Sequence, residues 1–163
     1  MRKLFLIGLA LALVLCGCGA RETLETIADD IPVESVLGEM REISVRLPDG
    51  AVSPVLKSEA EQLYLSEDYE ILVQTCPAGN LNDTIRKLTG FDKDQLTVME
   101  TEQDGAKRYD FVWAAAGEDG ERLGRAAVLD DGSYHYCLSV LRDAQGEKSQ
   151  VVWSEVFSSF GLT

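Results

Sequence analysis

Histidine is nearly absent from this sequence of 163 residues, which contains only His135. A single histidine excludes a multi-histidine metal centre and leaves little from which to build a catalytic triad. The chain also lacks a Gly-x-Gly-x-x-Gly fingerprint, a phosphate-binding loop, a Gly-x-Ser-x-Gly turn and a His-Glu-x-x-His motif. These absences predict a protein that is not an enzyme and that has no cofactor, no metal site and no catalytic residue.

Basic residues are scarce as well: 15 Lys and Arg stand against 28 Asp and Glu, a net charge of −13. Such a surface repels phosphate backbones and anionic lipid head groups. We therefore expect no nucleic-acid partner, and we expect any membrane contact to depend on something other than charge.

No apolar run is long enough to cross a bilayer. The longest, residues 4–15, has 12 residues and would rise about 18 Å as a helix, whereas a span needs about 20 residues. It follows Arg2 and Lys3 and ends among small residues, which is typical of a secretory signal peptide.

The end of this leader, Leu15-Cys16-Gly17-Cys18, resembles the lipobox of bacterial lipoproteins. In that motif a small residue precedes the cysteine that becomes the lipidated N-terminus; Gly17 before Cys18 fits, and Leu15 before Cys16 does not. The resemblance implies a signal peptide over residues 1–17, a diacylglycerol anchor on Cys18, and a protein held on the extracytoplasmic face of the cell membrane. Two acyl chains suffice for stable anchoring. The alternative is an ordinary signal peptide with two incidental cysteines.

Cleavage after Gly17 would leave 146 residues with 13 basic and 28 acidic side chains, a net charge of −15. Residues 18–40 are polar and acidic and are interrupted by Pro32 and Gly38, which is typical of a tether. Residues 41–163 suit one folded domain.

Alternating apolar and polar residues predict the strands of this domain. The expected ranges are 43–47, 62–65, 69–75, 97–102, 107–115, 121–129 and 134–141. Asp104-Gly105, Asp119-Gly120 and Asp131-Gly132 separate the last four ranges, and Asp-Gly favours tight hairpin turns, so these four should form an antiparallel meander. The ranges 62–65 and 69–75 should form a hairpin.

Two helices are expected beside the sheet. One covers residues 81–88, with Asn80 or Asn82 as its N-cap and Gly90 after its end. The other covers residues 150–160, where Trp153, Phe157 and Phe160 recur at helical spacing and predict a buried stripe. The predicted fold class is α+β: a meander sheet of about six to seven strands, flanked by a short middle helix and a C-terminal amphipathic helix.

The element order and the pattern Trp153-x-x-x-Phe157-x-x-Phe160 resemble the PsbP-like α/β sandwich, over about residues 42–162. The resemblance implies a central antiparallel sheet flanked by helices and a binding or assembly role. That family has no shared active-site motif, so no family site residue carries over.

Cys76 and Cys137 would remain after processing. Both fall on the less apolar side of their predicted strands, so the thiols could meet if the strands are neighbours. Two outcomes stay open: a disulfide, which is common outside the cytoplasm, or two small buried thiols.

The acidic clusters Asp92-Lys93-Asp94 and Asp130-Asp131 lack the ordered oxygen spacing of a calcium loop, and turn and helix-start chemistry accounts for them. Metal binding is not expected there.

The function expected from these features is a non-enzymatic binding or assembly module of the cell envelope, anchored through Cys18 and contacting another envelope protein. The alternative is a small-ligand carrier with a pocket between sheet and helix, for which Tyr64, Tyr109 and Tyr136 are candidate lining residues, although core packing also accounts for them. A hydrolase would require an acid and a nucleophile converging on His135.

Overall fold

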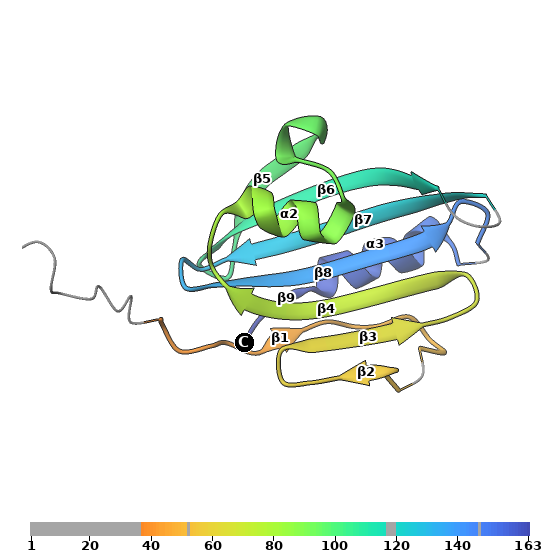
Figure 1. Cartoon of the computed structure of the whole chain (residues 1–163). Coiled ribbons are helices and arrows are strands. Elements are labelled where there is room, and N and C mark those ends of the chain that lie inside the picture. Colours follow the sequence, from red (N-terminus) through yellow and green to blue (C-terminus); the bar gives the residue numbers. More distant parts are fainter. Residues whose placement is uncertain (1–36, 52, 117–119, 147) are drawn as a thin grey trace, which may run out of the picture. The chain divides into compact units, whose positions relative to one another are not determined.

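The computed structural model describes residues 37–51, 53–116, 120–146 and 148–163. The segment Leu37–Thr163 is one compact unit built on a seven-stranded antiparallel sheet in the order β2-β3-β4-β8-β7-β6-β5 (Figure 1). The strands of this sheet are β2 (Leu56–Lys57), β3 (Glu61–Leu65), β4 (Tyr69–Pro77), β5 (Val98–Gln103), β6 (Ala106–Ala116), β7 (Glu121–Asp130) and β8 (Tyr134–Asp143). The α+β class predicted from the sequence is confirmed.

The last four of these strands form the predicted meander, and β3 and β4 form the predicted hairpin. At the β5–β6 turn, Asp104 and Gly105 have φ values of 53° and 74°, the left-handed conformation that a tight hairpin requires. The meander and the hairpin join through β4 and β8, which pair along nine residues from Tyr69–Arg142 to Pro77–Tyr134.

The first predicted strand is too long. Only β1 (Ile43–Ser44) is a strand, and it pairs with β9 (Gly161–Leu162), which the sequence analysis did not predict. Val45 and Leu47 still pack against the core, so the alternation in this segment reports alternating burial. A strand also needs a neighbouring strand to hydrogen-bond its backbone groups, and here the neighbour, β9, pairs with only two residues.

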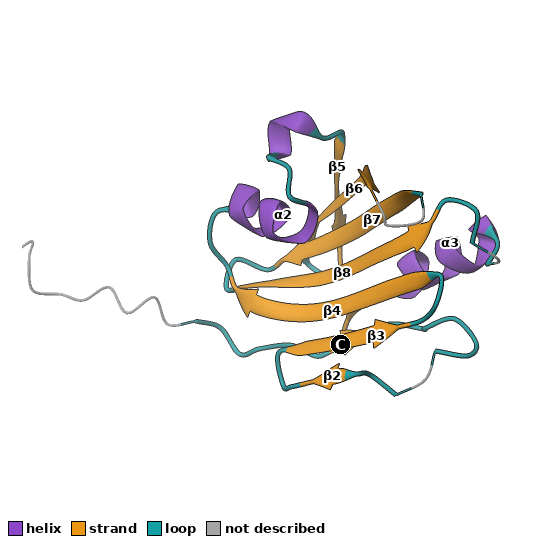
Figure 2. Ribbon diagram, turned by 45° about the vertical axis from the view of Figure 1, so that its right-hand side comes forward, coloured by secondary structure: helices purple, strands orange, loops and turns teal. Residues whose placement is uncertain are grey.

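The sheet carries one helix on each face (Figure 2). One is α2 (Leu81–Thr89), which is followed by the short 3₁₀ helix η1 (Lys93–Gln95). The other is α3 (Gln150–Ser159). In α2, the Asn80 side chain accepts a hydrogen bond from the Asn82 amide, so Asn80 is the N-cap.

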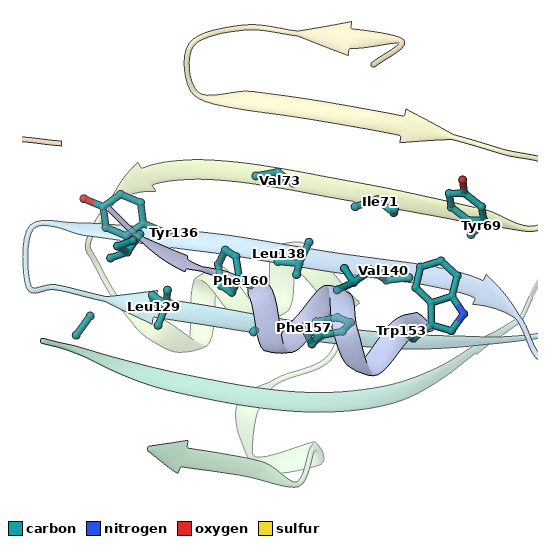
Figure 3. Packing of buried hydrophobic residues seen from close by; sticks show 14 residues of the cluster. Tyr69, Ile71, Val73, Leu129, Tyr136, Leu138, Val140, Trp153, Phe157 and Phe160 are labelled. Carbon is teal, nitrogen blue, oxygen red and sulfur yellow. The ribbon is translucent and has the colours of Figure 1, made fainter. Parts of the chain in front are cut away.

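Two apolar clusters hold these layers together. Figure 3 shows the larger cluster, in which Trp153, Phe157 and Phe160 lie over β4, β7 and β8. Its sheet residues include Ile71, Val73, Leu129, Leu138 and Val140. The cluster under α2 contains Ile85, Phe111, Trp113, Val128 and Cys137. The predicted stripe of the C-terminal helix is therefore buried against the sheet, as expected.

Candidate functional site

A groove of about 430 Å³ lies beside α3, over the strands that the helix leaves open. Its floor and walls come from β6, β7 and β8, and one side is formed by Trp153 and Phe157 of α3. Val112 of β6 faces this groove and is 61% exposed. This exposed apolar side chain is available for contact with a ligand or partner.

Two arginines bring positive charge to the groove. Arg125 of β7 lies with its guanidinium carbon 4.1 Å from the centroid of the Phe157 ring, and its Nη2 is 3.7 Å from Asp110 Oδ1. Arg142 of β8 donates from Nη1 to the carbonyl of its neighbour Asp143 at 3.4 Å. The groove therefore combines apolar walls with two cations, on a chain whose net charge is −13.

The Arg108–Asp110 ion pair holds the C-terminal end of α3 against the sheet. Arg108 Nε and Asp110 Oδ2 are 2.6 Å apart, and both side chains are nearly buried. The same guanidinium donates to the carbonyls of Phe157, at 3.1 Å, and of Phe160, at 3.3 Å. Phe157 is in the last turn of α3 and Phe160 is its C-cap, where carbonyls have no partner within the helix. This end of α3 is thus fixed to the sheet by a specific polar contact.

A larger hollow of about 810 Å³ lies near Asp68 and Glu121, at the start of β4 and β7 and the end of β8. Arg122, which lines it, already contacts Glu70 at 2.6 Å and Asp143 at 3.2 Å. Because the wall of this hollow is largely polar and that of the groove beside α3 is largely apolar, the groove is the better candidate for a binding site.

The three tyrosines proposed as pocket lining do not converge, and none lines the groove beside α3. Tyr109 lies on the α2 face, with Lys93 Nζ 5.4 Å from its ring centroid. Tyr136 lies on the α3 face, where its hydroxyl donates to Asp131 Oδ2 at 2.8 Å. Tyr64 donates to Gln62 Oε1 at the β3 edge. These contacts support the interpretation of the three tyrosines as core and turn residues and not as the lining of one pocket.

Cys76 and Cys137 lie on adjacent strands, because β4 pairs with β8. Cys76 is opposite His135 and Cys137 is opposite Gln74, so the two cysteines are diagonal neighbours. Both are free thiols in the structure; Cys76 is half-buried and Cys137 is buried. Whether they form a disulfide stays a prediction.

The two thiols have opposite environments. A hydrogen bond from Cys137 lowers the pKa of Cys76 from 9.0 to about 6, against the effect of burial, and Lys87 and a hydrogen bond from Thr84 lower it further. The same bond to Cys76, together with burial, raises the pKa of Cys137. Near neutral pH, the ionised member of the pair is therefore Cys76.

His135 is buried between a hydroxyl and a carboxylate. Its Nδ1 is 2.8 Å from Thr84 Oγ1, and its Nε2 is 3.7 Å from Asp130 Oδ2, beyond hydrogen-bond distance. Thr84 and His135 are 7% and 1% exposed, and neither lines the groove. A hydroxyl and a carboxylate thus flank the histidine, and the Asp130 side chain is 24% exposed.

The acidic clusters are used internally. Asp92 accepts from Asn82 at 3.0 Å and pairs with Arg86 at 2.7 Å, and Asp131 accepts from the backbone amides of Ser133 and Tyr134 in the β7–β8 turn. Among the residues that the structure describes, no three His, Cys, Asp or Glu side chains are grouped closely enough to hold a metal ion.

Sequence reasoning missed Val112, Arg125 and Arg142. A signal for Val112 was present: it is an apolar residue on the β6 face that also carries Arg108 and Asp110. The position of the arginines beside α3 had no local signal, because it depends on where a helix from the end of the chain lies.

The proposed lipidation residue, Cys18, and residues 18–36 of the proposed tether lie outside the described residues. Within the described part of the chain, no helix has both the length and the apolar character needed to cross a membrane. Comparison with protein families and with curated proteins finds no family model and no curated protein that matches this chain.

Proposed function

We propose that this protein is a lipid-anchored, non-enzymatic binding module on the extracytoplasmic face of the cell membrane, and that it binds another envelope component in the groove beside α3. The observation that carries the binding role is the groove itself, in which the exposed Val112 lies opposite Arg125 and Arg142 lies on the next strand, β8. The lipobox-like leader supports the location. The resemblance to PsbP-like domains supports a role in binding or assembly.

The chemistry of the groove suggests what it would bind. Val112 offers an exposed apolar side chain and the largely buried Trp153 and Phe157 line the groove, while Arg125 and Arg142 can pair with an anionic group. The matching partner is an envelope protein that presents an apolar side chain next to a carboxylate. Acidic surfaces elsewhere on the chain would repel such a carboxylate and so favour this groove.

A pull-down from solubilised membranes tests the partner. We expect Val112→Asp to remove a specific partner, because it places a carboxylate where the apolar contact forms. Val55→Asp is the matched control, since Val55 is also 61% exposed but lies just before β2 at the far edge of the sheet. Equal recovery by both variants, or turnover of an envelope substrate by the protein, would contradict the proposal.

Exchange of Cys18 for Ser tests the anchor. The Cys18→Ser variant should lose the lipid and leave the membrane fraction, whereas Cys16→Ser should behave as the unaltered chain because only Cys18 follows a small residue. Cell fractionation and intact-mass measurement report both results. Membrane retention of an unlipidated Cys18→Ser chain would refute the anchoring mechanism.

A small-ligand carrier is the second candidate, and the groove volume favours it. About 430 Å³ falls within the range of roughly 300–1,000 Å³ usual for small-molecule sites. The ligand would be an amphipathic anion. Native mass spectrometry of protein isolated from its own host discriminates the two, because a carrier should retain a small molecule and a protein-binding module should not.

A further inference from the structure

The feature that the proposed function does not use is the thiol pair beneath α2. Two paired strands bring Cys76 and Cys137 to diagonal positions on the same face of the sheet, although 60 residues separate them in the sequence. Thr84 of α2 hydrogen-bonds to His135, the residue opposite Cys76 in the strand pairing. The arrangement comes from three separate elements, β4, β8 and α2, so it is a property of the fold.

The two sulfur atoms differ in access. Cys76 is the penultimate residue of β4, is half-buried, and is followed by the loop that leads to α2. Cys137 lies in the middle of the sheet and is fully buried. An external reagent can therefore reach Cys76, while Cys137 is placed to react only with Cys76.

We propose that Cys76 is a thiol–disulfide exchange site and that Cys137 is its resolving cysteine, with a low-molecular-weight or protein disulfide as the oxidant. This inference does not rest on the binding role proposed above.

The exchange proceeds in two balanced steps. The Cys76 thiolate attacks one sulfur of the external disulfide, which forms a mixed disulfide and breaks the external S–S bond, releasing one thiolate. Cys137 then loses its proton and attacks Cys76 Sγ, which forms the Cys76–Cys137 bond and releases the second thiolate. The released thiolates take up protons, so the two protein thiols are oxidised by two electrons and the external disulfide is reduced to two thiols.

The electrostatic surroundings favour Cys76 as the attacking group. The neighbouring Cys137 thiol, the charge of Lys87 and the Thr84 hydroxyl lower the pKa of Cys76. His135 lies opposite Cys76 on β8, and its Nδ1 atom is hydrogen-bonded to Thr84. Accessible thiolates of this kind are the ones that exchange with disulfides.

The register favours a reversible bond. Diagonal residues on paired antiparallel strands have Cα atoms about 7–8 Å apart, beyond the usual separation for a disulfide of about 5.5–6 Å. Bond formation must draw β4 and β8 closer together at this point, and strained disulfides are more easily reduced. We therefore expect a bond that forms and breaks with the redox conditions.

The test uses the full-length protein in detergent, with oxidised glutathione as the probe. Free thiols are alkylated after exposure, and tryptic peptides carrying Cys76 and Cys137 are quantified by mass spectrometry. We expect a Cys76–Cys137 linked peptide that dithiothreitol converts back to free thiols. A Cys76 that stays fully alkylatable in oxidised glutathione would overturn the proposal.

Two variants separate the roles. Cys137→Ala should accumulate a glutathione mixed disulfide on Cys76, because the resolving thiol is missing. Cys76→Ala should leave Cys137 unmodified, because Cys137 is buried. Glutathione on Cys137 in the Cys76→Ala variant, at the rate seen for Cys76, would overturn the assignment. If the Cys137→Ala chain does not fold, the linked peptide in the unaltered chain still decides the question.

Discussion

Arg108 is the polar residue that ties the end of α3 to the sheet. It is a buried cation that contacts Asp110 and two carbonyls at the end of the helix. Removing one member of a buried ion pair leaves the other charge without compensation. Arg108→Met should therefore lower the free energy of unfolding by about 3 kcal/mol, measured by chemical denaturation. The double variant Arg108→Met/Asp110→Leu should regain much of this loss, and a double variant as unstable as the single one would contradict the explanation.

Gly124 is the second residue whose identity the packing requires. It lies directly opposite Trp113 in the β6–β7 pairing, and a Cβ there would overlap the indole ring. Gly124→Ala should lower the free energy of unfolding by about 1–3 kcal/mol, because the ring must move in a packed cluster. Gly79→Ala is the control, since a Cβ at Gly79 meets no atom within 4 Å. Equal stability of the two variants would show that the ring moves without cost.

The pKa of Cys76 makes a separate prediction. Because the thiolate is the reactive form, its alkylation rate should rise as the pH rises through about 6 and then level off. In Cys137→Ala the main hydrogen-bond donor is lost, so the midpoint should move to higher pH. Rates from quantified peptides over pH 5–9 check both statements, and a midpoint near 9.0 in the unaltered chain would contradict them.

At the scale of elements, α3 stabilises the domain through one buried stripe. Phe157→Ala should cost about 3–5 kcal/mol, since Phe157 is buried against the sheet. Val151→Ala on the same helix should change stability by less than about 0.5 kcal/mol, because Val151 is 65% exposed. Denaturation curves for the two variants measure the difference. A small effect at Phe157 would mean that α3 is not part of the cooperative unit.

Most of the elements could be predicted because their signals are local. The side-chain alternation of β4, β6 and β8 placed Ile71, Phe111 and Leu138 on faces that are indeed buried. The segment at residues 43–47 failed as a full strand, since its alternation arises from packing under the end of α3 and its pairing with β9 stops after two residues. Alternating burial and strand pairing both produce alternating apolar and polar residues, so only the presence of a neighbouring strand distinguishes the two.

At the scale of the whole molecule, a net charge of −13 raises the question whether the protein binds calcium ions. In the two acidic clusters, Asp92, Asp130 and Asp131 already accept hydrogen bonds from the protein. A ligand raises the melting temperature only if it binds the folded state in preference to the unfolded one. We expect millimolar calcium chloride to leave the melting temperature unchanged relative to sodium chloride of equal ionic strength. A rise that chelation reverses would reveal a site.

The sequence by itself determined the order of the hairpin, the meander and the two helices, the turns, the buried faces of these strands and the apolar stripe of the last helix, because each depends on neighbours a few residues apart; the short β2 and β9 were not predicted. Only the tertiary structure decided that β4 pairs with β8, which brings Cys76 near Cys137, and that α3 leaves Val112 exposed in a groove that Arg125 and Arg142 also line. These contacts join residues far apart in the chain. Which strands become neighbours depends on the packing of the whole sheet, and no local period in the sequence encodes it.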